Sequence, residues 1–346
     1  MTLFTLRKSA TIFISAALII VSCNSCSTDG PVTPDTPQTT VGITVSVPAF
    51  NQDSAYAFVK TQVDFGPRVP TTAQHKACGD WMVAKLKSYG ANVIEQTGNV
   101  TTFDGKTFPL RNIIGEFNPS AKKRIVLAAH WDTRPFADKD PDKSLWKKPI
   151  DGANDGGSGV GVLLEIARLI SIQAPKMGID IVFFDAEDYG VPEFNNSNES
   201  SDTFTWCLGS QYWMRNPHKT GYNAECGILL DMVGADGAIF NKEGKSMERA
   251  MSTVAQVWNI AAKFGYGSLF VDNETGEIVD DHQFMNAAGI PTIDIIDMRP
   301  EIKAMGMESY GFGSFHHTHN DNMSVISTNT LKAVGHTVSH FIYTYR

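Results

Sequence analysis

One stretch constrains the fold more than any other. An apolar, β-prone run from Ile179 to Phe184 ends at three carboxylates, Asp185, Glu187 and Asp188. A buried strand that delivers acids to its end is typical of open α/β sheets, in which ligands gather at the carboxyl ends of the strands. Two adjacent carboxylates there can divide the work, because one can bind a metal while the other moves protons. The simpler interpretation is a strand followed by an acidic, solvated turn, and other motifs are needed to decide between the two.

Segments typical of strands and of helices alternate along most of the chain. We predict strands at 93–102, 112–117, 124–129, 179–184, 227–230 and 292–296, and helices at 54–62, 72–89, 160–172, 246–264 and 325–343. This alternation predicts an α/β fold, a three-layer sandwich with a central mixed, mostly parallel sheet flanked by helices. The first two strands are expected at one edge of the sheet, and residues 298–315 are expected to form a long loop.

Composition narrows the class of protein. A chain of 346 residues, 42% of them hydrophobic, is long enough to bury a large core. The formal net charge is -8 and the chain has no basic cluster, which argues against a nucleic-acid partner.

The first residues have the pattern of a bacterial export signal. A short positive region precedes an apolar run at 11–21, which is too short to span a bilayer comfortably. The run ends in Ile20-Val21-Ser22-Cys23, which resembles a lipobox. We predict a lipoprotein signal peptide at 1–22, lipidation of Cys23, a flexible tether at 23–50 and a folded domain at 51–346. The expected product is an exported bacterial lipoprotein, lipid-anchored and either periplasm-facing or outer-membrane-associated. A plain secretory signal is the alternative.

Three cysteines remain in the predicted domain: Cys78, Cys207 and Cys226. An exported chain can pair two of them, but an odd number leaves one over. No Cys-x-x-Cys spacing indicates a thiolate zinc site, so we expect these cysteines to be mainly structural.

Acids and histidines recur at one kind of place, where a predicted strand ends or in the loop after it. They are His130, Asp132, Asp155, Glu187, Asp188, Asp231 and His317. Charged groups beside a core are costly unless they are paired or bind a metal. Mixed histidine and carboxylate ligands suit zinc, and three protein ligands leave a position open for substrate. Some of these acids have simpler interpretations: Asp155 can be the N-cap of the next helix, and Asp231 or Asp280 a strand-end or capping acid.

Three motifs, in this order, carry a family resemblance. They are His130-x-Asp132, Asn154-Asp155-Gly156-Gly157-Ser158-Gly159 and Phe183-Phe184-Asp185-x-Glu187-Asp188, followed by Asp231 and His317. From about residue 52 to its end, the chain resembles the zinc aminopeptidases of peptidase family M28 and their relatives, the type II (animal-type) glutaminyl cyclases. The resemblance implies a zinc-exopeptidase-like fold and a zinc-dependent catalytic domain.

Two features chiefly favour the cyclases. In the peptidases a Gly-Ser pair usually follows the paired acids within a few residues, whereas Gly209-Ser210 lies beyond a polar insertion at 191–205. Asp280-Asp281-His282 resembles the acidic pair that precedes a histidine in the cyclases. One feature differs, because the cyclases carry Trp just before the zinc histidine and this chain has His316 there.

The resemblance implies a glutaminyl-peptide cyclotransferase, a zinc-dependent acyltransferase that converts N-terminal Gln of peptides or proteins to pyroglutamate with release of ammonia. One zinc per chain would be bound by Asp155, Asp188 and His317. Glu187 would shuttle the proton, with Asp231 and Asp280 in a carboxylate network beside it. Candidate groups in the substrate pocket or around the ligands are His130, Trp131, Asp132, Trp206, His316 and His319.

Two alternatives stay open. A di-zinc M28 aminopeptidase would bind two zinc ions through His130, Asp155, Asp188, Asp231 and His317. Asp188 would then stand where that family usually has Glu. The other alternative is a lipoprotein that binds peptides without catalysis, and it predicts that Glu187→Gln changes no measured property.

Overall fold

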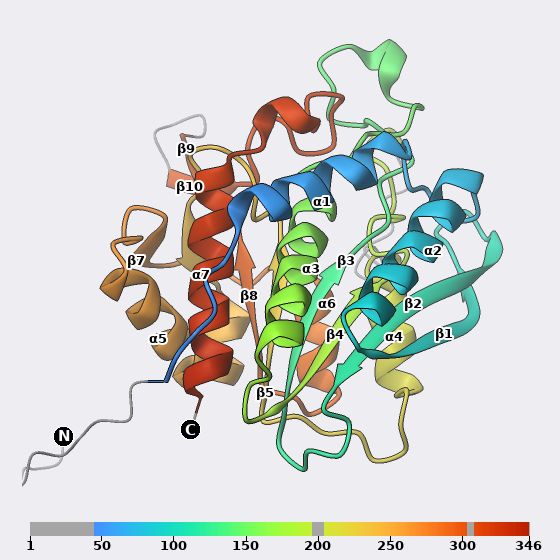
Figure 1. Ribbon diagram of the computed structural model, residues 1–346. Coiled ribbons are helices and arrows are strands. Elements are labelled where there is room, and N and C mark those ends of the chain that lie inside the picture. The colour runs from blue at the N-terminus through green and yellow to red at the C-terminus, as the bar shows by residue number, and fades with distance from the viewer. Residues whose placement is uncertain (1–44, 196–203, 303–307, 346) are drawn as a thin grey trace, which may run out of the picture. The chain divides into compact units, whose positions relative to one another are not determined.

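The computed structural model describes residues 45–195, 204–302 and 308–345 (Figure 1). The predicted signal peptide, Cys23 and the predicted tether up to residue 44 lie outside the described residues. The predicted end of the tether at residue 50 is wrong, because Val45 and Val47 pack against the core and Phe50 is buried. These apolar side chains place the start of the compact unit at Val45.

A six-stranded sheet forms the centre of the fold, in the strand order β1-β2-β4-β3-β5-β8. Its strands are β1 (Asn92–Thr101), β2 (Thr107–Phe117), β3 (Arg124–His130), β4 (Gly178–Phe184), β5 (Cys226–Asp231) and β8 (Thr292–Ile296). The pairs β1–β2 and β2–β4 are antiparallel, whereas β4–β3, β3–β5 and β5–β8 are parallel. The predicted mixed, mostly parallel sheet is confirmed, and so is the place of β1 and β2 at one edge.

Helices cover both faces of this sheet (Figure 1). One face carries α1 (Gln52–Asp64), α2 (Ala73–Ser88), α3 (Gly157–Ile172), α5 (Gly244–Lys263) and α7 (Thr328–Thr344), and the other carries α4 (Leu208–Arg215) and α6 (Asp281–Ala287). Alternate residues of the inner strands enter the two cores: Leu127 and Ile181 lie in the first, Val126 and Val182 in the second. Because both faces are covered, β3, β4 and β5 are buried along their whole length, which explains their nearly continuous apolar runs.

Smaller elements lie between these. They are β6 (Phe240–Lys242) paired with β7 (Phe270–Glu274), β9 (Arg299–Ile302) paired with β10 (Glu308–Gly311), and the 3-10 turns η1 (Lys143–Leu145) and η3 (Met323–Val325). The prediction of an irregular loop at 298–315 is therefore wrong. Neither β9 nor β10 has the alternating apolar pattern of a strand packed on a core, because they pair with each other and not with the main sheet.

The carboxyl ends of the parallel strands bring distant segments together. His130 at the end of β3 is opposite Phe184 at the end of β4, and Asp231 at the end of β5 is opposite Ile296 at the end of β8. The loops that leave these strands carry most of the predicted site residues, so the fold itself makes those residues converge.

Two further findings concern membrane-spanning helices and the cysteines of the described residues. Within the described ranges, no helix combines the length and apolar character that crossing a membrane requires. Cys78, Cys207 and Cys226 are all buried free thiols, which agrees with a structural role for Cys78 and Cys226, whereas Cys207 also contacts Glu187.

Candidate active site

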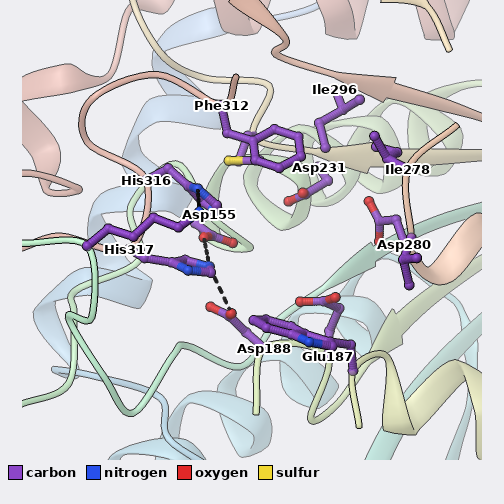
Figure 2. Close-up of a pocket in the computed structure, with 14 residues that line it drawn as sticks. Asp155, Glu187, Asp188, Asp231, Ile278, Asp280, Ile296, Phe312, His316 and His317 are labelled. Carbon is purple, nitrogen blue, oxygen red and sulfur yellow. Dashed lines mark hydrogen bonds and ion pairs between the residues drawn. The ribbon is translucent and has the colours of Figure 1, made fainter. Parts of the chain in front are cut away.

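A cavity of about 310 Å³ opens where β4, β5 and β8 end (Figure 2). Its titratable lining consists of five carboxylates and two imidazoles, from Asp155, Glu187, Asp188, Asp231, Asp280, His316 and His317, together with Lys139. Its other lining residues are aromatic or apolar: Trp206, Met232, Ile278, Val279, Ile296 and Phe312. All six residues that were predicted to bind metal or act in catalysis therefore face one cavity.

His317 lies at the centre of the predicted metal site. Its Nε2 is 3.2 Å from Oδ1 of Asp188 and 3.7 Å from Oδ2 of Asp155, and Figure 2 shows the ring directed at Asp188. Burial lowers the pKa of His317 well below its usual value, and the adjacent His316 lowers it further, so the ring is neutral and keeps a lone pair. Such a ring can accept a metal.

The two carboxylates fit a cation as well. Oδ2 of Asp155 and Oδ2 of Asp188 are buried and have no hydrogen-bond partner among the described residues. Burial raises the pKa of Asp188 well above its usual range, and the nearby Asp155 raises it further. Two carboxylates and a neutral imidazole are a donor set that zinc prefers, and a bound cation would remove the cost of placing the two acids together.

A glycine turn and a buried carboxylate position Asp155. Gly156 has a φ of 77°, and a Cβ there would lie 2.8 Å from Cε1 of His130, so only glycine fits. Asp321 accepts hydrogen bonds from the backbone N–H groups of Asn154 and Asp155 over 2.7 and 3.1 Å. The N-cap residue of α3 is Gly156 and not Asp155, and no side chain caps this helix by a hydrogen bond. The N-cap interpretation of Asp155 is therefore wrong.

A second buried carboxylate positions the loop after β4. The two oxygens of Asp132 accept hydrogen bonds from the N–H groups of Glu187 and Asp188, over 3.0 and 3.2 Å. Asp185, the first acid of this motif, faces elsewhere, because its Oδ1 lies 2.8 Å from Nε2 of His75. Only two of the three motif acids therefore reach the cavity.

Backbone strain gathers around the same cavity. Ala186, Cys207, Met232 and His317 all have positive φ, at 55°, 56°, 48° and 57°. This left-handed conformation costs a residue with a Cβ about 1–2 kcal/mol, and it persists where the surrounding packing holds it. The sequence carries no signal for these positions, since none of them is the glycine or asparagine that usually marks such a turn.

Glu187 is surrounded by other carboxyl groups. Burial raises the pKa of Glu187 well above its usual range, and Asp188, Asp280 and Asp281 raise it further, although His130 opposes them. Asp280 is both a helix cap and a cavity residue, since its side chain accepts a hydrogen bond from the N–H of Asp281 at the start of α6. A carboxyl group of raised pKa can hold and return a proton near neutral pH.

Cys207 contacts Glu187 without lining the cavity itself, and sequence analysis missed it. Its Sγ donates a hydrogen bond to Oε1 of Glu187 over 3.2 Å. Atoms of Glu187, Cys207 and Asp280 all lie within 4.8 Å of one another. Nothing in the sequence links position 207 to position 187, because the two residues are far apart along the chain and meet only in the folded protein.

His130 lies between two carboxylates. Its Nε2 is 3.0 Å from Oδ1 of Asp155 and 3.2 Å from Oδ1 of Asp231, and its Nδ1 is 3.5 Å from Oδ1 of Asp132. Burial opposes the charged ring, but these three acids raise the pKa of His130 well above its usual value. Protonated, the ring balances the charge of the acids. Deprotonated, it forms with Asp155 and Asp231 a second group of potential metal donors.

Asp138, which sequence analysis did not single out, lies on the Nδ1 side of the His317 ring. Oδ1 of Asp138 is 3.7 Å from Nδ1 of the ring. Arg134 fixes Asp138 with two hydrogen bonds of 2.7 and 2.6 Å, and it also donates to the backbone carbonyl of Asp188 over 3.1 Å. A carboxylate in this position orients a metal-binding histidine and makes it more basic.

Trp206 and His316 line the cavity as predicted pocket residues. The ring of Trp206 stacks on His317 with centroids 5.9 Å apart, and the guanidinium of Arg134 lies over the indole at 4.6 Å. His316 packs edge-on against Phe312, with centroids 4.8 Å apart, and burial lowers its pKa to about 3. Both walls are therefore aromatic and uncharged.

Two other predicted pocket residues lie elsewhere. Trp131 is buried in the core and stacks on His75, so its assignment to the pocket wall is wrong. Its indole N–H donates to the backbone carbonyl of Arg111, which satisfies its one polar group away from the cavity. His319 is also outside the lining, and its Nδ1 lies 3.2 Å from Oδ2 of Asp140.

Comparison with known proteins gives a family match and close structural relatives. The family model described as "Peptidase family M28" matches residues 112–342. The glutaminyl cyclase of Bacteroides thetaiotaomicron, solved with N-acetylhistamine bound, is 53% identical over 87% of this chain and 100% of its own, with a TM-score of 0.83. The glutaminyl cyclase of Tannerella forsythia is 50% identical over 86% of this chain and 100% of its own, with a TM-score of 0.81. A Zn-dependent exopeptidase from Parabacteroides distasonis is 52% identical, with the same two coverages and a TM-score of 0.82.

Curated relatives are more distant and include both activities. The uncharacterised protein YfbL of Escherichia coli is 35% identical over 32% of this chain and 31% of its own length. Aminopeptidase YwaD of Bacillus subtilis is 26% identical over 72% of this chain, which spans 47% of that protein. The glutaminyl-peptide cyclotransferase of Drosophila melanogaster is 23% identical over 75% of this chain and 72% of its own length.

Proposed function

The chain belongs to peptidase family M28, and within this family we propose that it is a glutaminyl-peptide cyclotransferase, converting N-terminal Gln of peptides or proteins to pyroglutamate with release of ammonia. Two solved relatives at 50% and 53% identity are glutaminyl cyclases, which supports the proposal. A Zn-dependent exopeptidase is equally similar, at 52%, so the choice depends on the site itself.

The observation that carries the proposal is that Glu187 and Asp280 both line the cavity with carboxylate oxygens within 4.8 Å of each other, while the thiol of Cys207 contacts Glu187. Cyclisation needs a base that takes a proton from an amine, holds it, and returns one to the departing ammonia. Burial and the neighbouring acids raise the pKa of Glu187, and so they stabilise the protonated carboxyl between the two transfers. No attacking water is needed for this reaction.

The reaction joins two ends of one residue of the substrate. The α-amine nitrogen attacks the carbon of its own γ-carboxamide, the new C–N bond forms, the old one breaks, and ammonia leaves. Glu187 takes the proton from the amine and returns one to the leaving nitrogen. The rings of Trp206 and Phe312 border the cavity and would keep the flexible Gln side chain folded, with its reacting atoms close together.

Asp155, Asp188 and His317 would hold one zinc ion, through the free Oδ2 atoms of the two acids and Nε2 of the histidine. Zinc bound there would supply a Lewis acid that polarises a carbonyl oxygen and stabilises negative charge on it. In this single-metal arrangement the protonated ring of His130 balances Asp155 and Asp231.

The di-zinc aminopeptidase is the second candidate, and one observation favours it. His130, Asp155 and Asp231 offer ligand atoms within 4.8 Å of one another, so they could bind a second ion. The two functions therefore predict different metal contents, with one zinc per chain for the cyclase and two for the peptidase.

The experiment that tests the proposal measures product and metal on the same sample. Zinc-loaded protein is incubated with a peptide that begins with Gln, and ammonia, the N-terminal residue and bound zinc are quantified. We expect ammonia release, a blocked N-terminus and one zinc per chain. Release of free amino acids with two zinc ions per chain would instead establish the aminopeptidase.

We also propose that the N-terminal segment makes this enzyme a lipoprotein. The support is the lipobox-like sequence at 20–23, followed by a segment rich in Pro and Thr. Mass spectrometry of the mature N-terminus tests this directly. We expect an acylated Cys23 that Cys23→Ala abolishes, whereas an unmodified N-terminus would contradict the anchor.

A further inference from the structure

Lys139 stands apart from the acids of the cavity. Among the described residues that line it, Lys139 is the one lysine or arginine. Its side chain is 37% exposed, so it lies at the mouth and not on the floor. Its Nζ donates a hydrogen bond to Nδ1 of His316 over 3.0 Å, and its backbone N–H donates to the carbonyl of His317 over 3.2 Å. The cation is therefore held beside the proposed metal ligand.

The charge of Lys139 is only partly balanced. Its carboxylate partner, Glu193, is 4.0 Å away with a side chain that is 58% exposed, and exposed pairs of this kind are weak. The adjacent Asp138 is already bound to Arg134. An anion beside the ammonium group would therefore be stabilised.

The opposite side of the cavity mouth is apolar. Val279 is 44% exposed and, like the partly buried Ile278, borders the cavity. Figure 2 shows Ile278 across the cavity from His316, which carries the hydrogen bond from Lys139. The mouth thus has a cation on the side of the metal ligands and an apolar surface on the other side.

We propose that Lys139 selects substrates that carry a negative charge directly after the N-terminal Gln. That charge is the side chain of Asp or Glu or, in a dipeptide, the free α-carboxylate. The inference rests on the proposed function, because it takes the Gln side chain to lie between the zinc ligands and Glu187.

The path of the substrate leads from the floor of the cavity to Lys139. The proposed metal ligands Asp155, Asp188 and His317 are buried and Glu187 is only partly exposed, so the residue after Gln has to leave through the mouth. Nδ1 of His316 accepts the hydrogen bond from Lys139, so the neutral imidazole holds the ammonium group at the mouth.

The test compares three peptides that differ only after Gln, with Glu, Ala or Lys at that position and an amidated C-terminus. Zinc-loaded full-length protein is assayed at low salt for pyroglutamate formation, and kcat/KM is measured for each peptide. We expect the Glu peptide to exceed the Lys peptide about tenfold, with Ala between them. The ratio should fall toward one in about 0.5 M salt, which screens exposed charges.

Two variants assign the preference to this side chain. Lys139→Met removes the charge and keeps most of the length, and it should reduce the ratio to about two or less. Lys139→Arg is the matched control, since it keeps the charge, and it should retain most of the preference. Because the ratio is measured within each variant, a smaller folded fraction does not change it.

A comparison of dipeptides tests whether the free α-carboxylate is recognised in the same way as an acidic side chain. A Gln-Gly dipeptide with a free carboxylate should be cyclised faster than its amide, and Lys139→Met should remove that difference too. A wild-type ratio near one, or a ratio unchanged in Lys139→Met, would overturn the inference and leave the cyclase proposal standing. The absence of pyroglutamate from every peptide would overturn the proposed function itself.

Discussion

The thiol of Cys207 donates its hydrogen bond to Oε1 of Glu187 over 3.2 Å. Burial raises the pKa of Cys207 well above its usual value, and Glu187 raises it further, so the group stays a protonated donor. We expect Cys207→Ala to lower kcat about tenfold with little change in KM, because the Glu187 carboxyl loses a positioning contact. The rate of ammonia release measures this.

Serine provides the control for that variant. Cys207→Ser restores a donor at the same place, and both replacements carry a Cβ through the same left-handed backbone. We expect Ser to recover most of the rate that Ala loses. Equal rates in the Ala variant and the wild type would show that the thiol only fills space.

Asp138 should control metal affinity through His317. Asp138→Asn leaves a neutral group 3.7 Å from Nδ1 of the ring, so the ring is less basic and less well oriented. We expect zinc affinity to fall about 10–100-fold, as measured by competition with a chelator. Asp140→Asn is the matched control, because that carboxylate contacts His319 and not a proposed ligand. Similar losses in both variants would point to a general disturbance of the loop.

Glu187→Gln separates catalysis from folding and metal binding. The amide keeps the size of the side chain but cannot take a proton, so we expect kcat to fall by about 10²–10⁴. Zinc content should be unchanged, and the unfolding temperature should not fall, since the change removes a carboxyl from a cluster of like charges. Turnover close to that of the wild type would exclude Glu187 as the proton shuttle.

Glu243 should make stability depend on acid pH. Although burial opposes its charge, hydrogen bonds from His282 and from the N–H groups of Lys245 and Ser246 lower the pKa of Glu243 to about 2. The pKa in the unfolded chain is about 4.3, so the stabilisation is complete above about pH 5 and is lost as the pH falls toward 2. Glu243→Gln should cost about 3 kcal/mol of unfolding free energy at pH 7, and the difference from the wild type should shrink below pH 4.

Urea unfolding at several pH values measures this difference. Glu248→Gln serves as the control, because Glu248 is exposed on the same helix and pairs only with surface groups. We expect little change from that substitution. A Glu243→Gln variant that unfolds like the wild type at pH 7 would refute the assignment.

The convergence of the acids at one cavity could be predicted because it follows from a general rule of parallel sheets. Buried strands are visible as apolar runs, and their carboxyl ends share one edge. Positions as far apart as His130, Asp188 and Asp231 could therefore be placed together from the sequence. The family motifs added His317, whose position depends on a loop and not on a strand.

The contacts between loops could not be predicted. Asp138 lies near His317 and Cys207 contacts Glu187, but neither of these contacts follows from a strand or helix pattern in the sequence. Trp131 was misplaced for a related reason. It directly follows the strand residue His130, but its side chain turns into the core and not toward the cavity. The sequence shows where the strand ends, but it does not show to which side of the sheet the next side chain points.

Arg134 has a consequence for how ligands influence one another. Its guanidinium holds the carboxylate behind His317, contacts the backbone of Asp188 and lies over the ring of Trp206. One buried side chain thus joins two proposed metal ligands to a wall of the substrate cavity. If zinc increases the affinity for a peptide through this connection, the peptide must increase the affinity for zinc by the same factor. Metal and substrate are then heterotropic effectors of each other, and neither dissociation constant is fully defined without the concentration of the other.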